Sequence, residues 1–286
     1  MHTQKILRHK FIQIVVSAIL FICITPFVFA QHKTGQSKFK VIAFYTGKND
    51  QAHISFVHEA NNWFPKMAKQ YHFTYDSTND WSNLNPTFLA AYQVVIFLDT
   101  RPEDSLQRIH FENYMRNGGA WMGFHFSAFA LTPSVFTQNW NWYHNIFLGS
   151  GEYVSNTWRP TSAILRVENK TLAPVKHLPK TFSSAPNEWY RWKNDLSTNP
   201  AIKILLSIDS SSFPLGTGPK PYEIWHSGYY PVAWTNTHYK MVYINMGHND
   251  IDYEHSSNTT LSFTFKNKTQ NKFIIKSLLW LAKKRK

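Results

Sequence analysis

The sequence predicts an α/β fold in which a mostly parallel central sheet is flanked by helices. Its clearest strand signals are short, continuous apolar runs without polar alternation, which are typical of strands covered on both faces. Segments of helical periodicity separate these runs in the first half of the chain, and turn residues end them. Strands that alternate with helices pair in parallel through right-handed crossovers, so we expect one sheet with helices on both faces.

The first half of the chain supplies the expected core strands. We expect strands over residues 39–45, around Phe73 and Tyr75, over 94–98 and over 120–124. Between them, apolar residues at helical spacing predict a helix over 54–64, and a second helix opens at Pro102 and reaches Arg116 before a glycine pair. The runs over 39–45, 94–98 and 120–124 lack polar alternation, so we expect them to be neighbours in the middle of the sheet.

The second half of the chain is mainly β-rich. We expect the sheet to continue through residues 164–167, 202–208, 232–234 and 241–246, and an amphipathic helix to close the chain over 273–281. Residues 216–219, with the sequence Gly-Thr-Gly-Pro, are predicted to be a loop. The phosphate-binding patterns GxGxxG and GxxxxGK[ST] do not occur, so the sequence does not predict a nucleotide site of either kind.

The first 30 residues have the pattern of a secretory signal peptide. Three basic residues precede an almost wholly apolar stretch that ends in small residues. We therefore expect cleavage before Gln31, a linker over 31–38, one domain over 39–283 and a basic tail over 284–286. The protein is then exported, either periplasmic or secreted, and has no transmembrane segment after cleavage. An uncleaved anchor is the alternative.

The only cysteine, Cys23, lies inside this apolar stretch. The residues before it, Leu20-Phe21-Ile22, lack the small residue that a lipoprotein cleavage site places before its cysteine. The mature chain is therefore expected to contain no cysteine. It does not need disulfides, because a chain of this length can bury a large hydrophobic core.

The chain carries a formal net charge of +13, and the signal peptide accounts for three of these positive charges. Four more basic residues form the stretch over 283–286. The remaining excess of basic residues is interspersed with acidic residues. Nucleic-acid recognition requires basic residues that gather on one face, and the sequence shows no such face. The charge therefore does not predict a nucleic-acid partner, and it is better explained by solubility.

Three histidines follow the ends of predicted strands. His125 comes directly after the strand over 120–124, His248 comes soon after the strand over 241–246, and His53 lies just beyond the turn that ends the first strand. In open parallel sheets, ligands bind at the carboxyl ends of the strands. If the sheet is parallel, we expect the three imidazoles to converge in one pocket, with Glu188 close enough to join them.

His125 occupies the position of the nucleophile in a turn that has the pattern of a nucleophile elbow, over residues 123–128. Imidazole at this position is suited to proton transfer, to metal binding or to donating a hydrogen bond. One hypothesis is that His125 and His248 work as an acid and base pair, with Glu188 orienting or assisting them. The other is that His53, His125 and His248 bind a divalent metal such as zinc, although their sequence spacing is not a compact metal motif.

The residues around these histidines also resemble a known family. Six blocks occur in order: Thr46-Gly47 with His53, 118–125, 140–149, 187–190, 230–234 and 243–248. Across residues 40–281 the chain resembles the trehalose-utilisation, or ThuA-like, family. The resemblance implies a flavodoxin-like fold of the class I glutamine-amidotransferase-like kind and a carbohydrate ligand.

The chain departs from these patterns in two places. Amidotransferases of this fold need an elbow cysteine, but His125 stands there and the mature chain has no cysteine, so glutaminase chemistry is excluded. The family's usual Asp before the Glu is Asn187 here, which weakens the case for a carboxylate pair at Glu188. His248 stands where amidotransferases place their triad histidine, and Asp250 is expected to be a surface loop residue.

Trp142, Tyr143 and Trp234 are the aromatic candidates for stacking on a sugar, and plain packing in the core is the alternative for all three. Alternating carboxylates at Asp250, Asp252 and Glu254 lack the turn glycine and distal glutamate of a calcium loop, so we expect them to be solvated.

Taken together, the histidines and the resemblance predict an exported protein that acts on or binds a small carbohydrate, either a sugar or a keto-sugar derivative, in a histidine-lined pocket. Hydrolysis, lyase cleavage and isomerisation are all compatible with histidine acid and base chemistry. The alternative is a non-catalytic sugar-binding module derived from an enzyme fold, because a fold does not determine whether its site is catalytic.

Overall fold

The computed structural model describes residues 37–48, 50–131, 139–157, 160–215, 225, 228–251 and 260–283. The predicted signal peptide, the linker up to residue 36, the loop over 216–219, Asp252, Glu254 and the basic tail lie outside these residues. Contacts among residues 37–286 form one unit. In the part of the chain that is described, no helix has both the length and the apolar composition needed to cross a membrane.

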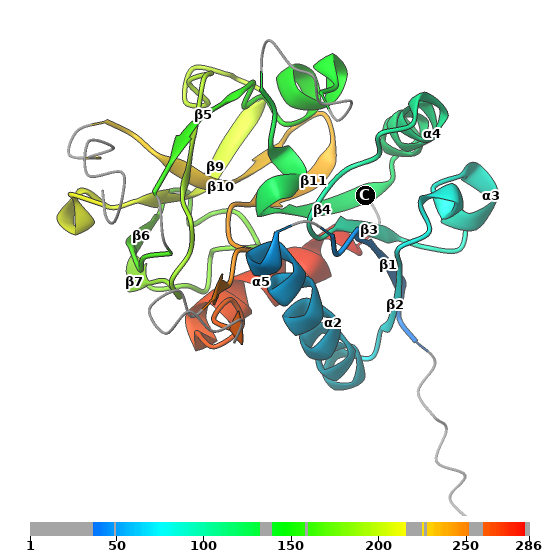
Figure 1. Ribbon diagram of the computed structural model, residues 1–286, viewed down its shortest axis with the longest axis horizontal. Coiled ribbons are helices and arrows are strands. Elements are labelled where there is room, and N and C mark those ends of the chain that lie inside the picture. The colour runs from blue at the N-terminus through cyan, green and yellow to red at the C-terminus, as the bar shows by residue number, and fades with distance from the viewer. Residues whose placement is uncertain are drawn as a thin grey trace, which may run out of the picture. The chain divides into compact units, whose positions relative to one another are not determined.

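The central sheet has nine strands in the described part of the chain. They are β1 (Lys40–Phe44), β2 (Thr74–Thr78), β3 (Val94–Phe97), β4 (Ala120–Phe124), β6 (Ile164–Val167), β7 (Thr181–Ser183), β9 (Ile202–Ile208), β10 (Pro231–Asn236) and β11 (Lys240–Ile244). Their order is β2-β1-β3-β4-β11-β10-β9-β6-β7 (Figure 1). The three apolar runs that were expected to be neighbours are β1, β3 and β4, and this prediction is confirmed.

The sheet is parallel in one half and antiparallel in the other. Strands β2, β1, β3, β4 and β11 all pair in parallel. From β11 onward, the pairs with β10, β9, β6 and β7 are antiparallel. Residues 237–239 join β10 to β11, and this connection is far too short for the crossover that parallel strands need. The expectation of a mostly parallel sheet therefore holds only for the half of the sheet from β2 to β11, and the whole sheet is mixed.

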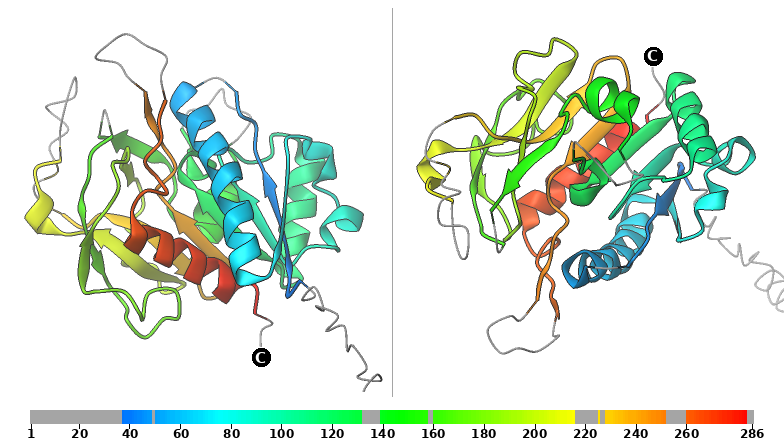
Figure 2. Two further views of the ribbon diagram at one scale, coloured as in Figure 1. Left: turned by 90° about the horizontal axis from the view of Figure 1, so that it is seen from below. Right: turned by 45° about the horizontal axis from the view of Figure 1, so that its top comes forward.

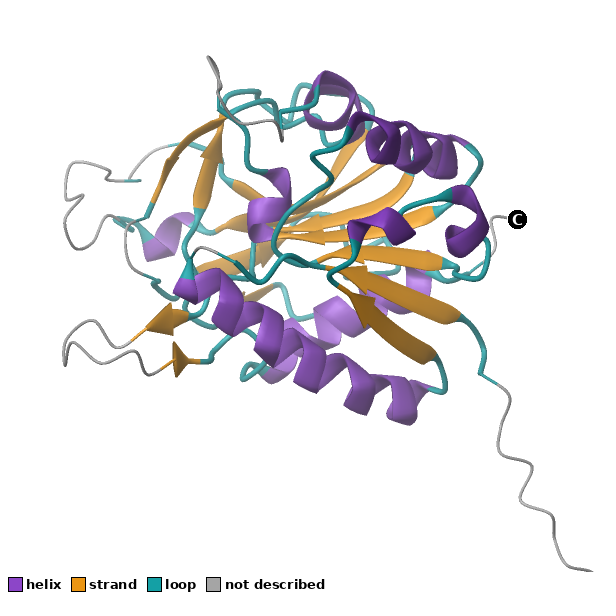
Figure 3. Cartoon of the chain, turned by 45° about the vertical axis from the view of Figure 1, so that its right-hand side comes forward, coloured by secondary structure: helices purple, strands orange, loops and turns teal. Residues whose placement is uncertain are grey.

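Helices cover both faces of the sheet (Figures 2 and 3). The α-helices are α2 (Gln51–Tyr71), α3 (Pro86–Leu89), α4 (Ser105–Arg116) and α5 (Lys268–Leu281), and single turns occur at η1 (Trp81–Asn83), η2 (His125–Ala128), η3 (Trp142–Phe147) and η4 (Ser210–Ser212). Helices α2 and α5 lie on one face, and α3 and α4 lie on the other. The short elements α3, β5, β7 and β8 were not predicted from the sequence.

Each core strand sends alternate side chains to the two faces. In β1, Val41 and Ala43 pack in the cluster that includes residues of α2 and α5, whereas Ile42 and Phe44 pack in the cluster that includes Phe111 of α4. All four of these β1 side chains are buried. This arrangement explains why the strand shows no polar alternation, since neither of its faces meets water.

Two small sheets lie outside the central one. Strand β5 (Tyr153–Asn156) pairs antiparallel with β8 (Tyr190–Trp192), and β12 (Asp250–Ile251) pairs with β13 (Thr260–Leu261). An isolated bridge joins Thr161 to Asn187 just before β8. Asp250 therefore begins a strand, in contrast to the surface loop expected there, and the β5 and β8 pair brings Glu188 toward the parallel half of the sheet.

Candidate functional site

The structure brings together the three histidines that follow the strands of the parallel half. His125 begins the turn η2 directly after β4, His248 follows β11, and His53 lies in the first turn of α2. Their ring centroids are 5.4 Å apart for His53 and His125, 5.1 Å for His53 and His248, and 5.3 Å for His125 and His248. The rings thus form a nearly equilateral triangle.

Glu188, in the segment just before β8, completes the cluster from outside the central sheet. Its Oε2 atom lies 3.3 Å from Nε2 of His125 and 3.7 Å from Nε2 of His248. One possible metal-binding atom from each of His53, His125, Glu188 and His248 lies within 4.8 Å of the others. The His125 side chain is fully buried, whereas 10% of Glu188 and 9% of His248 remain exposed and His53 is partly exposed, so the cluster meets solvent along these three residues.

The backbone at His125 has the strained geometry of an elbow. Its φ angle is +38°, which non-glycine residues rarely adopt. Gly247 leaves room for this turn, because a Cβ atom at that position would lie 3.1 Å from Cβ of His125. The Tyr243 hydroxyl donates a hydrogen bond of 2.9 Å to the carbonyl oxygen of His125. A strained residue that its neighbours hold in this way is typical of a functional site.

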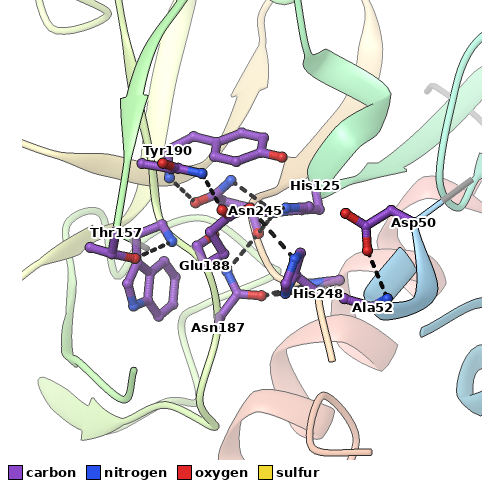
Figure 4. A network of polar contacts seen from close by, with 12 residues as sticks. Asp50, Ala52, His125, Thr157, Asn187, Glu188, Tyr190, Asn245 and His248 are labelled. Carbon is purple, nitrogen blue, oxygen red and sulfur yellow. Dashed lines mark hydrogen bonds and ion pairs between the residues drawn. The ribbon is translucent and has the colours of Figure 1, made fainter. Parts of the chain in front are cut away.

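Asn245 determines which nitrogen of His125 faces the cluster. The Nδ1 atom of His125 lies 2.8 Å from the carbonyl oxygen of Asn245 (Figure 4). Because a carbonyl oxygen only accepts hydrogen bonds, Nδ1 is assigned the ring proton, and Nε2 presents its lone pair to Glu188. This is the arrangement that orients histidine ligands in metal sites.

Asn187 joins the segment before β8 to the end of β11. Its amide nitrogen donates hydrogen bonds of 2.8 Å to the carbonyl oxygen of Glu188 and 2.9 Å to that of Asn245. Its amide oxygen accepts hydrogen bonds from the backbone N–H groups of Gly247, at 3.1 Å, and His248, at 3.3 Å. Only an amide can donate and accept in this way, so Asn187 holds two site loops together where an Asp could not.

The carboxylate of Glu188 is held from the other side by Asn156 of β5, whose amide nitrogen donates a hydrogen bond to Oε1. Trp189, the residue after Glu188, is fully buried, and its backbone N–H donates a hydrogen bond of 2.9 Å to the hydroxyl of Thr157 (Figure 4). Glu188 is therefore a positioned, buried residue.

Burial lowers the pKa of all three histidines. The pKa of His125 falls to about 3, because the ring has no contact with water and the hydrogen bond to Asn245 offsets this only in part. The pKa values of His53 and His248 move in the same direction for the same main reason. The neutral imidazole, which is the form that binds metals, is therefore favoured at all three positions.

Asp50, Asn156 and Asn245 also hold the site together, although the sequence did not single them out as site residues. The side chain of Asp50 caps the N-terminus of α2 by accepting a hydrogen bond of 2.8 Å from the N–H of Ala52, and it interacts electrostatically with His53 and His248. Asn245 stands in one of the six sequence blocks. Asp50 stands three residues before His53, and Asn245 stands three residues before His248. An Asn or Asp so close to a candidate ligand is the feature of the sequence that could have identified them.

The three aromatic residues expected to bind sugar lie in the hydrophobic core. Tyr143 and Trp234 are fully buried, and only 7% of Trp142 is exposed. The indole N–H of Trp234 donates a hydrogen bond of 2.8 Å to the carbonyl oxygen of Leu148, inside the cluster on the α4 face. Of the two alternatives that the sequence left open for these rings, their burial supports plain packing in the core.

The chain is similar to known proteins along most of its length. The family model ThuA, described as trehalose utilisation, matches residues 41–263. A solved structure of a putative ThuA-like protein from Bacteroides uniformis is 31% identical, with a TM-score of 0.75, over 88% of this chain and 95% of that one. No curated protein matches the chain.

Two more distant structures are similar in fold alone. A putative ThuA-like protein from Parabacteroides merdae is 17% identical, with a TM-score of 0.55, over 85% of this chain and 90% of that one. A cytoplasmic protein from Salmonella typhimurium is 8% identical, with a TM-score of 0.51, over 84% of this chain and 98% of that one. At such low identity, the likeness concerns the arrangement of helices and strands.

Proposed function

Because the chain belongs to the ThuA family, which is described as trehalose utilisation, we propose that it acts on a sugar or keto-sugar derivative at a divalent-metal centre. The ligands are His53, His125, Glu188 and His248. Zinc is the metal that best suits this set, since imidazole nitrogen and carboxylate oxygen are among its ordinary ligands.

The contact between His125 and Glu188 is the observation that carries this proposal. The Nε2 atom of His125 presents a lone pair, because Nδ1 is committed to the carbonyl oxygen of Asn245. The Glu188 oxygen that lies 3.3 Å away is also an acceptor. Two buried acceptors at this distance repel each other unless a metal ion or a shared proton lies between them. A metal ion at this position leaves all three imidazoles neutral.

A proton on one of the imidazoles is one alternative, and burial opposes it, because removing an imidazolium from water is costly and the pKa of each of the three rings is lowered. A metal ion has no such conflict, since it needs the imidazoles in their neutral form. Burial therefore favours a metal over the metal-free acid and base pair of His125 and His248. A proton on the carboxyl group of Glu188 is the other alternative, and measuring the metal content distinguishes it from a metal.

The spacing of the cluster also supports a tetrahedral shell. Ligand atoms that lie about 2.0–2.1 Å from zinc are about 3.3 Å from one another. The distance from Nε2 of His125 to Oε2 of Glu188 matches this value, and that from Nε2 of His248 is 3.7 Å. Nε2 of His53 is buried without a hydrogen-bond partner. The four candidate atoms lie within 4.8 Å of one another, so the cluster must contract before every pair reaches this spacing.

A metal at this position supplies Lewis-acid chemistry to a sugar, because it polarises a hydroxyl or carbonyl oxygen. Zinc accepts a fifth ligand, so a sugar oxygen can bind beside the four side chains. The exposed edges of Glu188 and His248 are where such an oxygen would enter. The carboxylate of Glu188 is then close enough to take or return a proton.

We also assign the fold to the flavodoxin-like, class I glutamine-amidotransferase-like kind. The parallel half supports this assignment, because its strands follow the order 2-1-3-4-5 when they are numbered within that half. Glutaminase chemistry is not part of the proposal, since His125 stands at the elbow and the only cysteine is Cys23. The signal-peptide pattern of residues 1–30 supports action outside the cytoplasm.

Metal analysis tests the proposal. The protein without its first 30 residues is purified without chelator, and its zinc, iron, manganese and nickel contents are measured. We expect about one metal ion per chain, and we expect His125→Ala to lose it. His58→Ala is the matched control, because His58 is an exposed histidine of the same helix as His53. A wild-type protein that stays metal-free after reconstitution with each metal would contradict the proposal.

A sugar panel tests the second half of the proposal. Wild type and His125→Ala are incubated with disaccharides, including trehalose, and with forms in which one hydroxyl is oxidised to a ketone, and products are followed by mass spectrometry. We expect turnover of at least one compound by wild type alone. Saturable binding without turnover would identify a sugar-binding module instead of an enzyme.

A further inference from the structure

Aromatic rings border the histidine cluster on one side. The ring of Phe126 lies 4.9 Å from that of His53 and stacks on Phe129 at 4.6 Å, with 16° between the ring planes. Phe129 in turn lies 4.8 Å from Tyr153. We call Phe126, Phe129 and Tyr153 the aromatic wall.

Tyr190 connects the aromatic wall to the opposite side of the cluster. Its ring lies 5.1 Å from that of Tyr153 and 4.1 Å from that of His125. Together with Phe126 beside His53, this makes an unbroken series of ring contacts that begins and ends at a histidine. The aromatic wall is thus adjacent to the candidate metal ligands, unlike Trp142 and Trp234, which lie in the core.

Backbone contacts hold the aromatic wall in place. Phe126 lies in the η2 turn, and its carbonyl oxygen accepts a hydrogen bond of 3.3 Å from the buried guanidinium of Arg101. Tyr153 begins β5, and its N–H donates a hydrogen bond of 2.8 Å to the carbonyl oxygen of Ala130, the residue after Phe129. Phe126 and Phe129 lie in the segment that follows His125, and Tyr153 is hydrogen-bonded to it. A ligand on the wall therefore has a defined distance from His125.

The aromatic wall is more exposed than the deeper part of the cluster. Phe126, Phe129 and Tyr153 are each partly exposed, as is His53 beside them, whereas His125, Glu188 and His248 are buried. Partly exposed apolar rings next to a buried polar centre give two surfaces of different chemistry. A pyranose ring has the same division, since it carries C–H groups on its faces and hydroxyl groups around its edge.

We propose that the aromatic wall is a sugar subsite, on which a pyranose ring stacks with its edge oxygens directed toward Glu188 and His248. This subsite rests on the proposed function, and its stacking surface is formed by rings other than the candidates Trp142, Tyr143 and Trp234. It selects ligands that have an exposed C–H face, such as glucose-type pyranosides. Acyclic polyols lack that face and bind weakly.

Calorimetric titration with trehalose, its ketone form and the acyclic polyol sorbitol tests the subsite. The variants are Phe129→Leu and Tyr153→Leu, which keep apolar volume but remove the flat ring. Phe88→Leu is the matched control, since Phe88 of α3 is another partly buried phenylalanine. Its ring packs against that of Tyr92 at 5.2 Å. Metal content and circular dichroism are measured for each variant.

We expect each wall variant to weaken binding of the disaccharide by about tenfold, which is typical for the loss of one aromatic contact. Metal content should be unchanged, and Phe88→Leu should bind like wild type. Unchanged affinity in both wall variants, with wild type binding sugar, overturns the subsite and leaves the proposed function standing. A metal-loaded wild type that binds none of the sugars overturns the subsite together with the carbohydrate half of the proposed function.

Discussion

The Nε2 atom of His125 and the Oε2 atom of Glu188 lie 3.3 Å apart, although the two residues belong to different sheets. His125 follows β4 of the central sheet, whereas Glu188 lies just before β8, which pairs with β5 in a separate two-stranded sheet. The candidate site therefore forms where this small sheet meets the ends of the parallel strands. Its chemistry depends on how accurately the two parts are held together.

Replacing the carboxylate of Glu188 tests its role as a ligand. Glu188→Gln keeps the size of the side chain but removes its negative charge, so we expect metal affinity to fall by a factor on the order of 100. Competition with a fluorescent zinc chelator measures the affinity. Glu112→Gln, which changes a glutamate on the surface of α4, is the control. Equal affinity in the Glu188 variant and wild type would remove Glu188 from the ligand set.

The lowered pKa values of the histidines predict how stability changes with pH. Below the ordinary histidine pKa of 6.5, the unfolded chain takes up protons that the buried rings of the metal-free protein do not. The free energy of unfolding therefore falls as pH falls from 6.5, by up to about 1.4 kcal/mol per pH unit for each buried ring.

Urea unfolding of the metal-free protein between pH 7.5 and 5 measures this slope. We expect His248→Gln to have a shallower slope than wild type, because it lacks one of the three buried rings. His58→Gln alters an exposed histidine and should leave the slope unchanged. Parallel slopes for wild type and His248→Gln would mean that His248 is accessible to protons in the folded protein.

The hydrogen bonds of Asn187 predict that replacing Asn by Asp lowers the free energy of unfolding more at this position than at Asn61. Asn187→Asp replaces the donor to the carbonyl oxygens of Glu188 and Asn245 by an acceptor, so we expect a loss of about 2–4 kcal/mol in the free energy of unfolding. Asn61→Asp is the control, since the Asn61 side-chain oxygen accepts a hydrogen bond from Tyr75, and a carboxylate can still accept it. Equal stabilities of the two variants would show that the amide donor of Asn187 is unimportant.

Gly247 is the position where the elbow can be disturbed without replacing a ligand. Its φ angle is +137°, and an added Cβ atom would lie 3.1 Å from Cβ of His125 and 3.2 Å from that of Phe124. We expect Gly247→Ala to destabilise the fold by about 2–4 kcal/mol and to weaken metal binding, because His125 must shift.

The control for this substitution is Gly118→Ala. Gly118 also has a positive φ, of +86°, but an added Cβ atom there would meet nothing within 4 Å. Gly118→Ala should lower the free energy of unfolding by about 1–2 kcal/mol through backbone strain and leave metal affinity unchanged. Thermal unfolding and the chelator competition are measured for both variants. A larger loss of metal affinity in the Gly118 variant would be incompatible with this account of the elbow.

The sequence by itself determined the core strands β1, β3, β4 and β11 and the candidate ligands. Apolar runs without alternation identified the strands, because burial on both faces leaves no position for a polar side chain. The same pattern marked the strand ends, and therefore His53, His125 and His248. Asn187, which was noted only as a departure from the family, has a structural role that its amide chemistry explains.

The tertiary structure alone decided which aromatic rings lie at the site and how Glu188 reaches it. The sequence shows that Trp142 and Phe129 are aromatic but not where their rings lie. Only the packing determines that Trp142 is in the core and that Phe129 borders the histidines. Likewise, Glu188 approaches His125 through the pairing of β5 with β8, whose residues are far apart in the chain. Sequence periodicity reports which faces of an element are buried, but contacts between distant segments depend on the packing of the whole chain.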